Sequence, residues 1–250
     1  MALGSSFAAG MGLGNRVAGS PIFSQRTTNS YPQQLARLLN IGSFTDMTSS
    51  GATVRHVLHG GQWGLGPQID ALGPDTRLVT LTAGGNDVAY VGDLVAMAYG
   101  NRKGMIGAVV ALFWKGAQAS GERDFSGLEQ NLTELLREIR RRSPQARIIV
   151  ATYPRILPGA GTCEQLGISE AQADTMRPVA AKLAEATRTA AAAADATVVD
   201  MDTLSAGHDP CGPEPWVNGF KPATGAPFHP TLAGAEATAL AIANVLEASN

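Results

Sequence analysis

Residues 77–87 read RLVTLTAGGND, a strand-like run that ends in a polar turn. The first six residues are rich in apolar and β-branched side chains, which is typical of a buried strand in a parallel sheet. In an open parallel sheet, ligands bind in the crevice at the carboxyl ends of the strands. Asn86 is therefore placed to aim its side-chain amide into such a crevice, although Gly84, Gly85, Asn86 and Asp87 also suit an ordinary turn.

Strand signals of the same kind recur along the chain and alternate with helix signals. Residues 147–152 (RIIVAT) and 197–201 (TVVDM) are short apolar runs that fit buried parallel strands. Residues 1–3 form a truncated first strand, and residues 44–48 are a weaker candidate. Residues 32–40 read as a helix with a proline near its start.

Later helices carry clearer boundary signals. Ser126 with Glu129, and Ser169 with Gln172, form capping boxes ahead of two long helices, and Pro178 is expected to kink or divide the second one. Strands that alternate with helices indicate a parallel sheet covered on both faces. The sequence therefore predicts a three-layer α/β/α sandwich with a central, mostly parallel sheet of about five strands. The last predicted helix has one apolar side, formed by Leu232, Ala235, Ala239, Ile242 and Leu246.

Length and charge favour one domain that acts on small molecules. A chain of 250 residues fits a single α/β domain over residues 1–250. Its net charge is −2, and its only basic run, at 140–142, closes a predicted helix. Cations are favourable at a helix C-terminus, so this run indicates capping rather than a nucleic-acid surface. Residues 93–120 interrupt the strand–helix rhythm, and we expect a cap or insertion there.

That interruption contains an apolar segment at 104–114, GMIGAVVALFW. It is shorter than the roughly 20 residues that a membrane span needs, so we expect no stable membrane insertion. Either the segment is buried against the body of the protein, or it lines a substrate groove as a small cap. In the second case it borders the acyl site and favours uncharged substrates of short to medium chain.

Two cysteines, Cys163 and Cys211, lie in loops rich in glycine and proline. They form two buried thiols, a disulfide, or a catalytic thiol with a bystander. Loop cysteines fill cores poorly, which favours the disulfide and hence an oxidising compartment. No signal peptide is visible, but the chain begins inside its first strand. We therefore expect that a leader has been removed and that the protein is secreted or periplasmic.

Three further segments place reactive side chains at predicted strand or helix ends: GSSFAAG at 4–10, SSGAT at 49–53 and FHP at 228–230. A serine after a strand exposes its hydroxyl, and Gly51 lets a backbone N–H approach an anion. Each segment alone also fits a plain turn. Together with Asn86 they supply a nucleophile, oxyanion donors and, in His229, a general base for acyl transfer.

The other three histidines are weaker candidates. His56 and His59 share a possible helix and are expected at the surface. Their i, i+3 spacing is a weak signal for a metal site, because no carboxylate partner is within reach. His208 lies in the same loop as a cysteine, where a structural role is expected. The chemistry predicted here needs no metal and no cofactor.

These four segments, in this order, resemble the blocks of the SGNH or GDSL-like hydrolase superfamily over nearly the whole chain. The resemblance implies a flavodoxin-like SGNH hydrolase fold and assigns the nucleophile to Ser6. It assigns the oxyanion hole to Ser6, Gly51 and Asn86, and the base to His229. Ser5 replaces the aspartate of the usual block. The stretch around GHDPC resembles the secreted lipase branch, in which paired loop cysteines are common.

A second departure concerns the residue that orients the histidine. The DxxH block of the family reads Ala226-Pro227-Phe228-His229 here, without the acid. Some members of the family work with a serine–histidine dyad, so we expect the carbonyl of Ala226 or Pro227 to orient the imidazole. The competing possibility is a distant acid brought near by the fold, from among Asp200, Asp202 and Asp209.

The expected function is hydrolysis of carboxylic esters with short to medium acyl chains, through an acyl-enzyme on Ser6. A thioesterase or lysophospholipase would use the same residues. An inactive binding module that kept the fold is the alternative of another class.

Overall fold

The computed structural model describes residues 1–114 and 116–248. Its sheet has four parallel strands, placed side by side in chain order. Leu81 is opposite Leu3 on one side and Val150 on the other, so the first three strands are in register at this level. The strands are β1 (Ala2–Gly4), β2 (Leu78–Thr82), β3 (Arg147–Ala151) and β4 (Thr197–Val199).

The expected fifth strand at 44–48 is reduced to a single parallel bridge between Ala2 and Asp46. The Asp46 carboxylate accepts hydrogen bonds from both the N–H and the hydroxyl of Thr48, at 3.0 and 2.6 Å. Such local side-chain bonds compete with strand pairing. The prediction of about five strands is therefore too high by one within the described residues.

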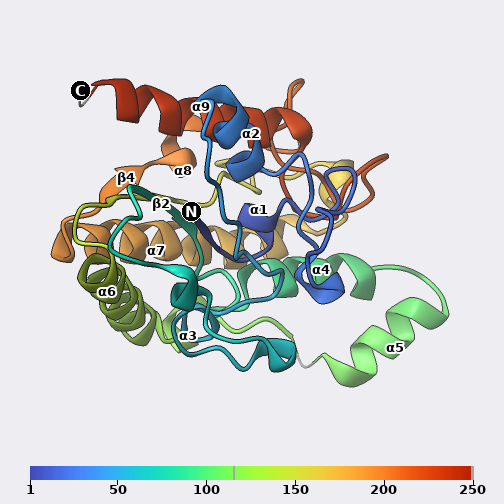
Figure 1. Ribbon diagram of the computed structural model, residues 1–250. Coiled ribbons are helices and arrows are strands. Elements are labelled where there is room, and N and C mark those ends of the chain that lie inside the picture. The colour runs from blue at the N-terminus through green and yellow to red at the C-terminus, as the bar shows by residue number, and fades with distance from the viewer. Residues whose placement is uncertain (115, 249–250) are drawn as a thin grey trace.

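Helices cover both faces of the sheet, which confirms the three-layer architecture (Figure 1). Helices α2 and α9 lie above the sheet in this view, and α3, α6 and α7 lie below it. The helices are α1 (Ser6–Ala9), α2 (Tyr31–Leu38), α3 (Val54–His59), α4 (Tyr90–Gly100), α5 (Met105–Phe113), α6 (Phe125–Arg142), α7 (Glu170–Ala193), α8 (Met201–Leu204) and α9 (Leu232–Ala248).

Alternate side chains of β3 pack into two separate hydrophobic cores. Ile148 and Val150 join the large core under α6 and α7, whereas Ile149 and Ala151 join the smaller core under α2 and α9. Successive side chains of a strand point to opposite faces, so a continuous apolar run is what a sheet covered on both faces requires. This burial fixes the sheet, and with it the position of every strand end.

Of the two capping boxes predicted from the sequence, one is present and the other is not. Ser169 and Gln172 form the predicted capping box of α7, and Pro178 lies inside that helix without dividing it. Helix α6 instead begins at Phe125, because the carboxylate of Asp124 accepts the N–H of Gly127 at 2.7 Å. Ser126 is therefore inside α6 and is not its N-cap.

The apolar segment at 104–114 forms α5, which packs on α4 and projects from the body (Figure 1). Met105, Val109 and Leu112 are exposed, so burial of the segment against the body is wrong for these side chains. Trp114 Nε1 donates to a carboxylate oxygen of Asp93 at 3.0 Å, which ties the end of α5 to α4. Within the described residues, no helix is both long and apolar enough to cross a bilayer.

A disulfide joins Cys163 and Cys211, as the loop positions favoured. Cys163 lies beyond the end of β3, and Cys211 follows α8. The bond therefore ties together two long loops that leave the carboxyl edge of the sheet.

Candidate active site

Ser6 and His229 meet although 223 residues separate them in the chain. Ser6 is the first residue of α1, directly after β1, and its Oγ lies 2.8 Å from His229 Nε2. Gly4 lets β1 end this close to β2, because a Cβ there would lie 2.3 Å from the carbonyl oxygen of Thr82. The predicted nucleophile and base are thus within hydrogen-bond distance.

The other nitrogen of the imidazole faces the backbone. His229 Nδ1 lies 2.7 Å from the carbonyl oxygen of Pro227, whereas the carbonyl of Ala226 accepts the backbone N–H of His229. Phe228 adopts a left-handed conformation, with φ of 55°, which turns the chain so that Pro227 meets the ring. A carbonyl can only accept, so Nδ1 carries the proton and Nε2 is free to accept from Ser6.

The three aspartates considered as alternatives are engaged elsewhere. Asp200 pairs with Arg188 at 3.0 Å, and Asp202 pairs with the same guanidinium at 3.2 Å. Asp209 accepts the backbone N–H of Cys211 at 2.9 Å. Among the described residues, no carboxylate has a hydrogen bond to His229.

The environment of His229 shifts its pKa. His229 is buried, and the ring of Phe7 packs against it with centroids 5.1 Å apart. This burial lowers the pKa of His229 below its usual 6.5, and the Pro227 carbonyl only partly offsets the effect. Burial therefore favours the neutral form of the imidazole, which is the form that the predicted general base would need.

The predicted oxyanion donors border the same space. Asn86 Nδ2 donates one hydrogen to the carbonyl of Ala52 at 2.9 Å, which leaves its second hydrogen for a ligand. Gly51 has φ of 80°, a conformation that favours glycine. Ser6 is at the start of α1, where an N–H has no intrahelical acceptor. Ser6, Gly51, Asn86 and His229 line one cavity of about 380 Å³.

The walls of this cavity are apolar, and the sequence patterns did not indicate them. Phe23 and Trp63 stack with ring centroids 5.6 Å apart, and both line the cavity. Val91 and Val95, from the first half of α4, line it from another side. Phe23 and Trp63 lie in single turns of 3₁₀ helix, Ile22–Ser24 and Gln62–Gly64, which are too short for a periodic pattern to mark which side chains face a site.

Two polar residues near the site were also missed. The carboxylate of Asp87 accepts the N–H of Val54 at 3.1 Å and so caps α3, while its burial raises its pKa to about 6. The hydroxyl of Tyr153 lies within hydrogen-bond distance of Ser5 and Gly85. Tyr153 follows β3, so the rule that strand ends meet at one edge could have identified it.

The remaining histidines have structural contacts. His56 Nδ1 accepts the N–H of Thr53 at 3.1 Å and completes a capping box, so it is half-buried rather than fully at the surface. His59 is exposed, as expected. The ring of His208 stacks on Trp216, and its Nδ1 lies 2.8 Å from the carbonyl of Glu214. Among the described residues no cluster could hold a metal ion.

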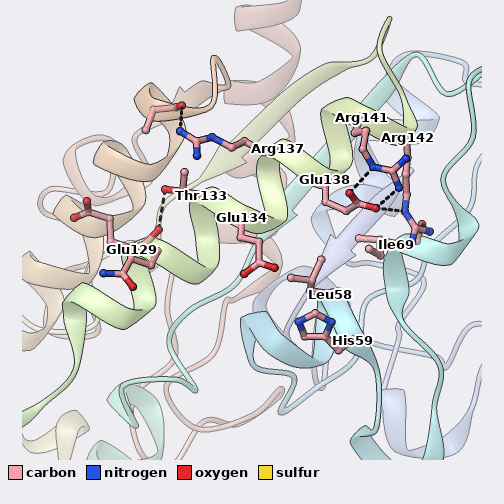
Figure 2. A pocket seen from close by; sticks show the side chains of 12 residues that line it. Leu58, His59, Ile69, Glu129, Thr133, Glu134, Arg137, Glu138, Arg141 and Arg142 are labelled. Carbon is pink, nitrogen blue, oxygen red and sulfur yellow. Dashed lines mark hydrogen bonds and ion pairs between the residues drawn. The ribbon is translucent and has the colours of Figure 1, made fainter.

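A larger cavity of about 730 Å³ lies between α3 and α6. Figure 2 shows that charged side chains of α6 dominate it, with Glu138 bonded to Arg141 and Arg142. The hydroxyl of Thr133 donates to the backbone of its own helix, to Glu129. This cavity therefore lacks the paired hydroxyl and imidazole of the smaller one.

Comparison with known proteins agrees with this geometry. The model of the GDSL-like lipase/acylhydrolase family matches residues 2–237. Lipase 2 of Streptomyces coelicolor is 32% identical over 228 residues, which cover 84% of this chain and 72% of that protein. Lipase 1 of the same organism is 27% identical over 98% of this chain and 85% of its own length.

Solved structures show the same likeness. An extracellular lipase from Streptomyces rimosus superposes with a TM-score of 0.75 at 25% identity, covering 97% of each chain. Phospholipase A1 from Streptomyces albidoflavus gives 0.76 at 25% identity, again with 97% of each chain. An acetylxylan esterase from Geobacillus stearothermophilus, at 19% identity and a TM-score of 0.55, shares the fold. The chain therefore belongs to the GDSL-like lipase/acylhydrolase family and is a carboxylic ester hydrolase.

Proposed function

We propose that this protein hydrolyses carboxylic esters of short to medium acyl chain through an acyl-enzyme on Ser6. The observation that carries the proposal is the unbroken contact from Ser6 Oγ to His229 Nε2 and from His229 Nδ1 to the Pro227 carbonyl, at 2.8 and 2.7 Å. This is the arrangement of nucleophile, base and orienting acceptor that acyl transfer uses.

In the first half of the reaction, His229 Nε2 takes the proton of Ser6 while Oγ forms a bond to the acyl carbon. The carbonyl oxygen gains the electron pair and accepts hydrogen bonds from the N–H groups of Ser6 and Gly51 and the Asn86 amide. When this oxyanion collapses, the bond to the alcohol oxygen breaks. His229 gives its proton to the alcohol, which leaves as a neutral molecule.

In the second half, a water molecule replaces the alcohol. His229 accepts a proton from the water, whose oxygen attacks the acyl carbon, and the same donors hold the new oxyanion. The bond to Ser6 Oγ then breaks, His229 returns the proton to Oγ, and the acid leaves. The Pro227 carbonyl stabilises the imidazolium at each half-step, less strongly than a carboxylate would because it is neutral.

The cavity supports the proposed chain length. Its volume of about 380 Å³ is at the small end of the roughly 300–1,000 Å³ common for small-molecule sites. Phe23, Trp63, Val91 and Val95 give it uncharged walls. These features favour an uncharged acyl group of modest size over a charged substrate.

Labelling with a fluorophosphonate probe tests the proposal. The wild-type protein is expected to form one covalent adduct, and Ser6→Ala is expected to form none and to lose ester hydrolysis. Ser5→Ala is the matched control, because Ser5 is the neighbouring hydroxyl and its Oγ faces Tyr153 instead. A labelled Ser6→Ala variant with an unlabelled Ser5→Ala variant would assign the nucleophile to Ser5.

The same residues would serve a thioesterase or a lysophospholipase. Comparing the rates on an ester and a thioester of the same acyl chain tests the thioesterase alternative. The names of two relatives, both called lipase, favour the ester. An inactive binding module would leave the probe unreacted even in the wild-type protein. That outcome would contradict the proposed reaction.

We further propose that the protein is secreted or periplasmic. The Cys163–Cys211 disulfide supports this, because such bonds persist in oxidising compartments. The likeness to an extracellular lipase supports it too. Fractionation of the native producing cells, with detection by antibody, tests it, and recovery only from the cytoplasm would contradict it.

A further inference from the structure

Large apolar side chains are exposed at two places next to the active-site cavity. Phe23 and Trp63 line the cavity, and Ile22 precedes Phe23 in the chain. Met105 and Leu112 lie on α5, and these five side chains have exposed fractions from 63% to 81%. Single exposed apolar residues are normal on a soluble protein, but a group of large ones marks a binding surface. We define the apolar rim as Ile22, Phe23, Trp63, Met105, Val109 and Leu112.

Helix α4 connects the two parts of the apolar rim. Its residues Val91 and Val95 line the cavity together with Phe23 and Trp63. Helix α5 packs on the same helix, where Trp114 donates to Asp93 at 3.0 Å. The other oxygen of Asp93 forms an ion pair with Arg123 at 2.7 Å. These contacts hold α5 on α4 while Met105, Val109 and Leu112 remain exposed. Figure 1 shows α5 projecting from the body.

The segments that carry the apolar rim are basic. Residues 94–121, which include α5, contain three lysines and arginines and no carboxylate, and residues 1–69 contain four arginines and one carboxylate, Asp46. The carboxylates of Asp70, Asp93 and Glu122 lie directly outside these ranges, and that of Asp93 is paired with Arg123. Arg102 and Lys103 are exposed immediately before α5.

We propose that the apolar rim docks on the surface of an anionic lipid bilayer. Apolar side chains bordered by lysine and arginine are the combination that binds such surfaces, through burial at the acyl boundary and attraction to anionic headgroups. A second copy of this chain is a poorer occupant, because two basic faces would repel each other. The docked orientation opens the cavity toward the lipid, so an ester can pass along Phe23 and Trp63 toward Ser6.

Only that last step, the passage of an ester, rests on the proposed function; the docking does not. Sedimentation with sucrose-loaded vesicles tests the docking directly. Wild-type protein is expected to bind vesicles of phosphatidylglycerol and phosphatidylcholine more tightly than vesicles of phosphatidylcholine alone. The double variant Met105→Gln/Leu112→Gln is expected to lower the partition coefficient at least tenfold, because two large apolar side chains no longer enter the bilayer.

Leu204→Gln/Leu240→Gln is the matched control, because both leucines are exposed but lie on α8 and α9. It is expected to bind vesicles like the wild type. Both double variants are expected to keep the wild-type melting temperature and the wild-type rate on a water-soluble acetate ester. Arg102→Gln/Lys103→Gln is expected to weaken binding to the anionic vesicles several-fold and to leave binding to the neutral vesicles unchanged.

The docking proposal would be overturned if the wild type bound neither kind of vesicle, or if the α5 variant and its control lost vesicle binding equally. It would also be overturned if light scattering showed that the wild type is a dimer and that the α5 variant is a monomer. The dimer result would mean that the apolar rim binds a second copy of this chain. If the wild-type protein does not hydrolyse the soluble ester at all, the proposed function is contradicted instead. Failure of the docking proposal and failure of the proposed function are therefore distinguishable.

Discussion

The hydroxyl of Tyr153 lies 3.0 Å from Ser5 Oγ and 3.1 Å from the backbone nitrogen of Gly85. Ser5 precedes Ser6, and Gly85 precedes Asn86, so one buried hydroxyl joins the loops that carry the proposed nucleophile and a proposed oxyanion donor. A Cβ on Gly85 would lie 2.9 Å from the Tyr153 ring, which explains why a glycine stands there.

The ring of Tyr153 contributes a third contact. It packs edge-on against Phe7 with centroids 4.6 Å apart, and Phe7 in turn packs against His229. Burial raises the pKa of Tyr153 to about 12, so the hydroxyl is neutral and keeps its proton at working pH. Tyr153 thus positions the surroundings of Ser6, Asn86 and His229 without lining their cavity.

Tyr153→Phe is expected to lower kcat about tenfold with little change in KM, because the donors of the oxyanion hole lose their fixed position. It is also expected to lower the free energy of unfolding by about 1–2 kcal/mol, the usual effect of leaving a buried N–H unpaired. Steady-state kinetics on a soluble ester and urea unfolding measure the two effects.

Tyr31→Phe is the control for that variant. Tyr31 is equally buried, its pKa is also raised to about 12, and its hydroxyl contacts the Thr82 side chain at 3.1 Å. We expect a similar change in stability with kcat preserved. Equal losses of kcat in both variants would show that Tyr153 acts only through stability.

Asn86→Ala is expected to lower kcat by roughly 10²–10³-fold, the usual loss for one oxyanion donor, with KM less affected. The variant also loses the hydrogen bond to the Ala52 carbonyl, so circular dichroism must verify the fold. Asn101→Ala, which removes an exposed amide bonded to Gln172, is expected to keep the wild-type kcat. An unchanged kcat in Asn86→Ala would mean that the GGND segment is only a turn and supplies no oxyanion donor.

The pH dependence should reveal the buried base. Only the neutral imidazole of His229 can accept the Ser6 proton, so kcat/KM falls when pH drops through the pKa of His229. Burial lowers that pKa below 6.5, and therefore the acid limb is expected to have its midpoint below 6.5. His59→Gln, at an exposed histidine, should leave the limb in place. A midpoint above 6.5 would contradict the effect of burial.

The disulfide should matter for stability more than for chemistry. Cys163 and Cys211 are 48 residues apart, and closing such a loop stabilises by about 4 kcal/mol in the chain-entropy model. The double variant Cys163→Ser/Cys211→Ser is expected to lose stability of this order while retaining kcat on a soluble ester. Non-reduced peptide mass spectrometry checks the bond, and two free thiols would contradict it.

Local patterns in the sequence determined the layers of the fold and the order of the site segments. The strand at β2 was predictable because RLVTLT is a short apolar run, and α7 because Ser169 and Gln172 signal its start. The ends of parallel strands share one edge, so Ser6 and Asn86 could be placed on the same side before any coordinates were known.

Tertiary structure decided what depends on non-local packing or on a single dihedral angle. The carbonyl of Pro227, rather than that of Ala226, faces the imidazole of His229 because Phe228 has a positive φ, which no periodicity reveals. Phe23 and Trp63 become cavity walls only when two short 3₁₀ turns, far apart in the chain, meet. An apolar run such as α5 looks alike whether it is buried or exposed, since composition does not say whether another element covers it. Sequence fixes local propensity and period, whereas contacts between distant segments follow from how the packed elements place them.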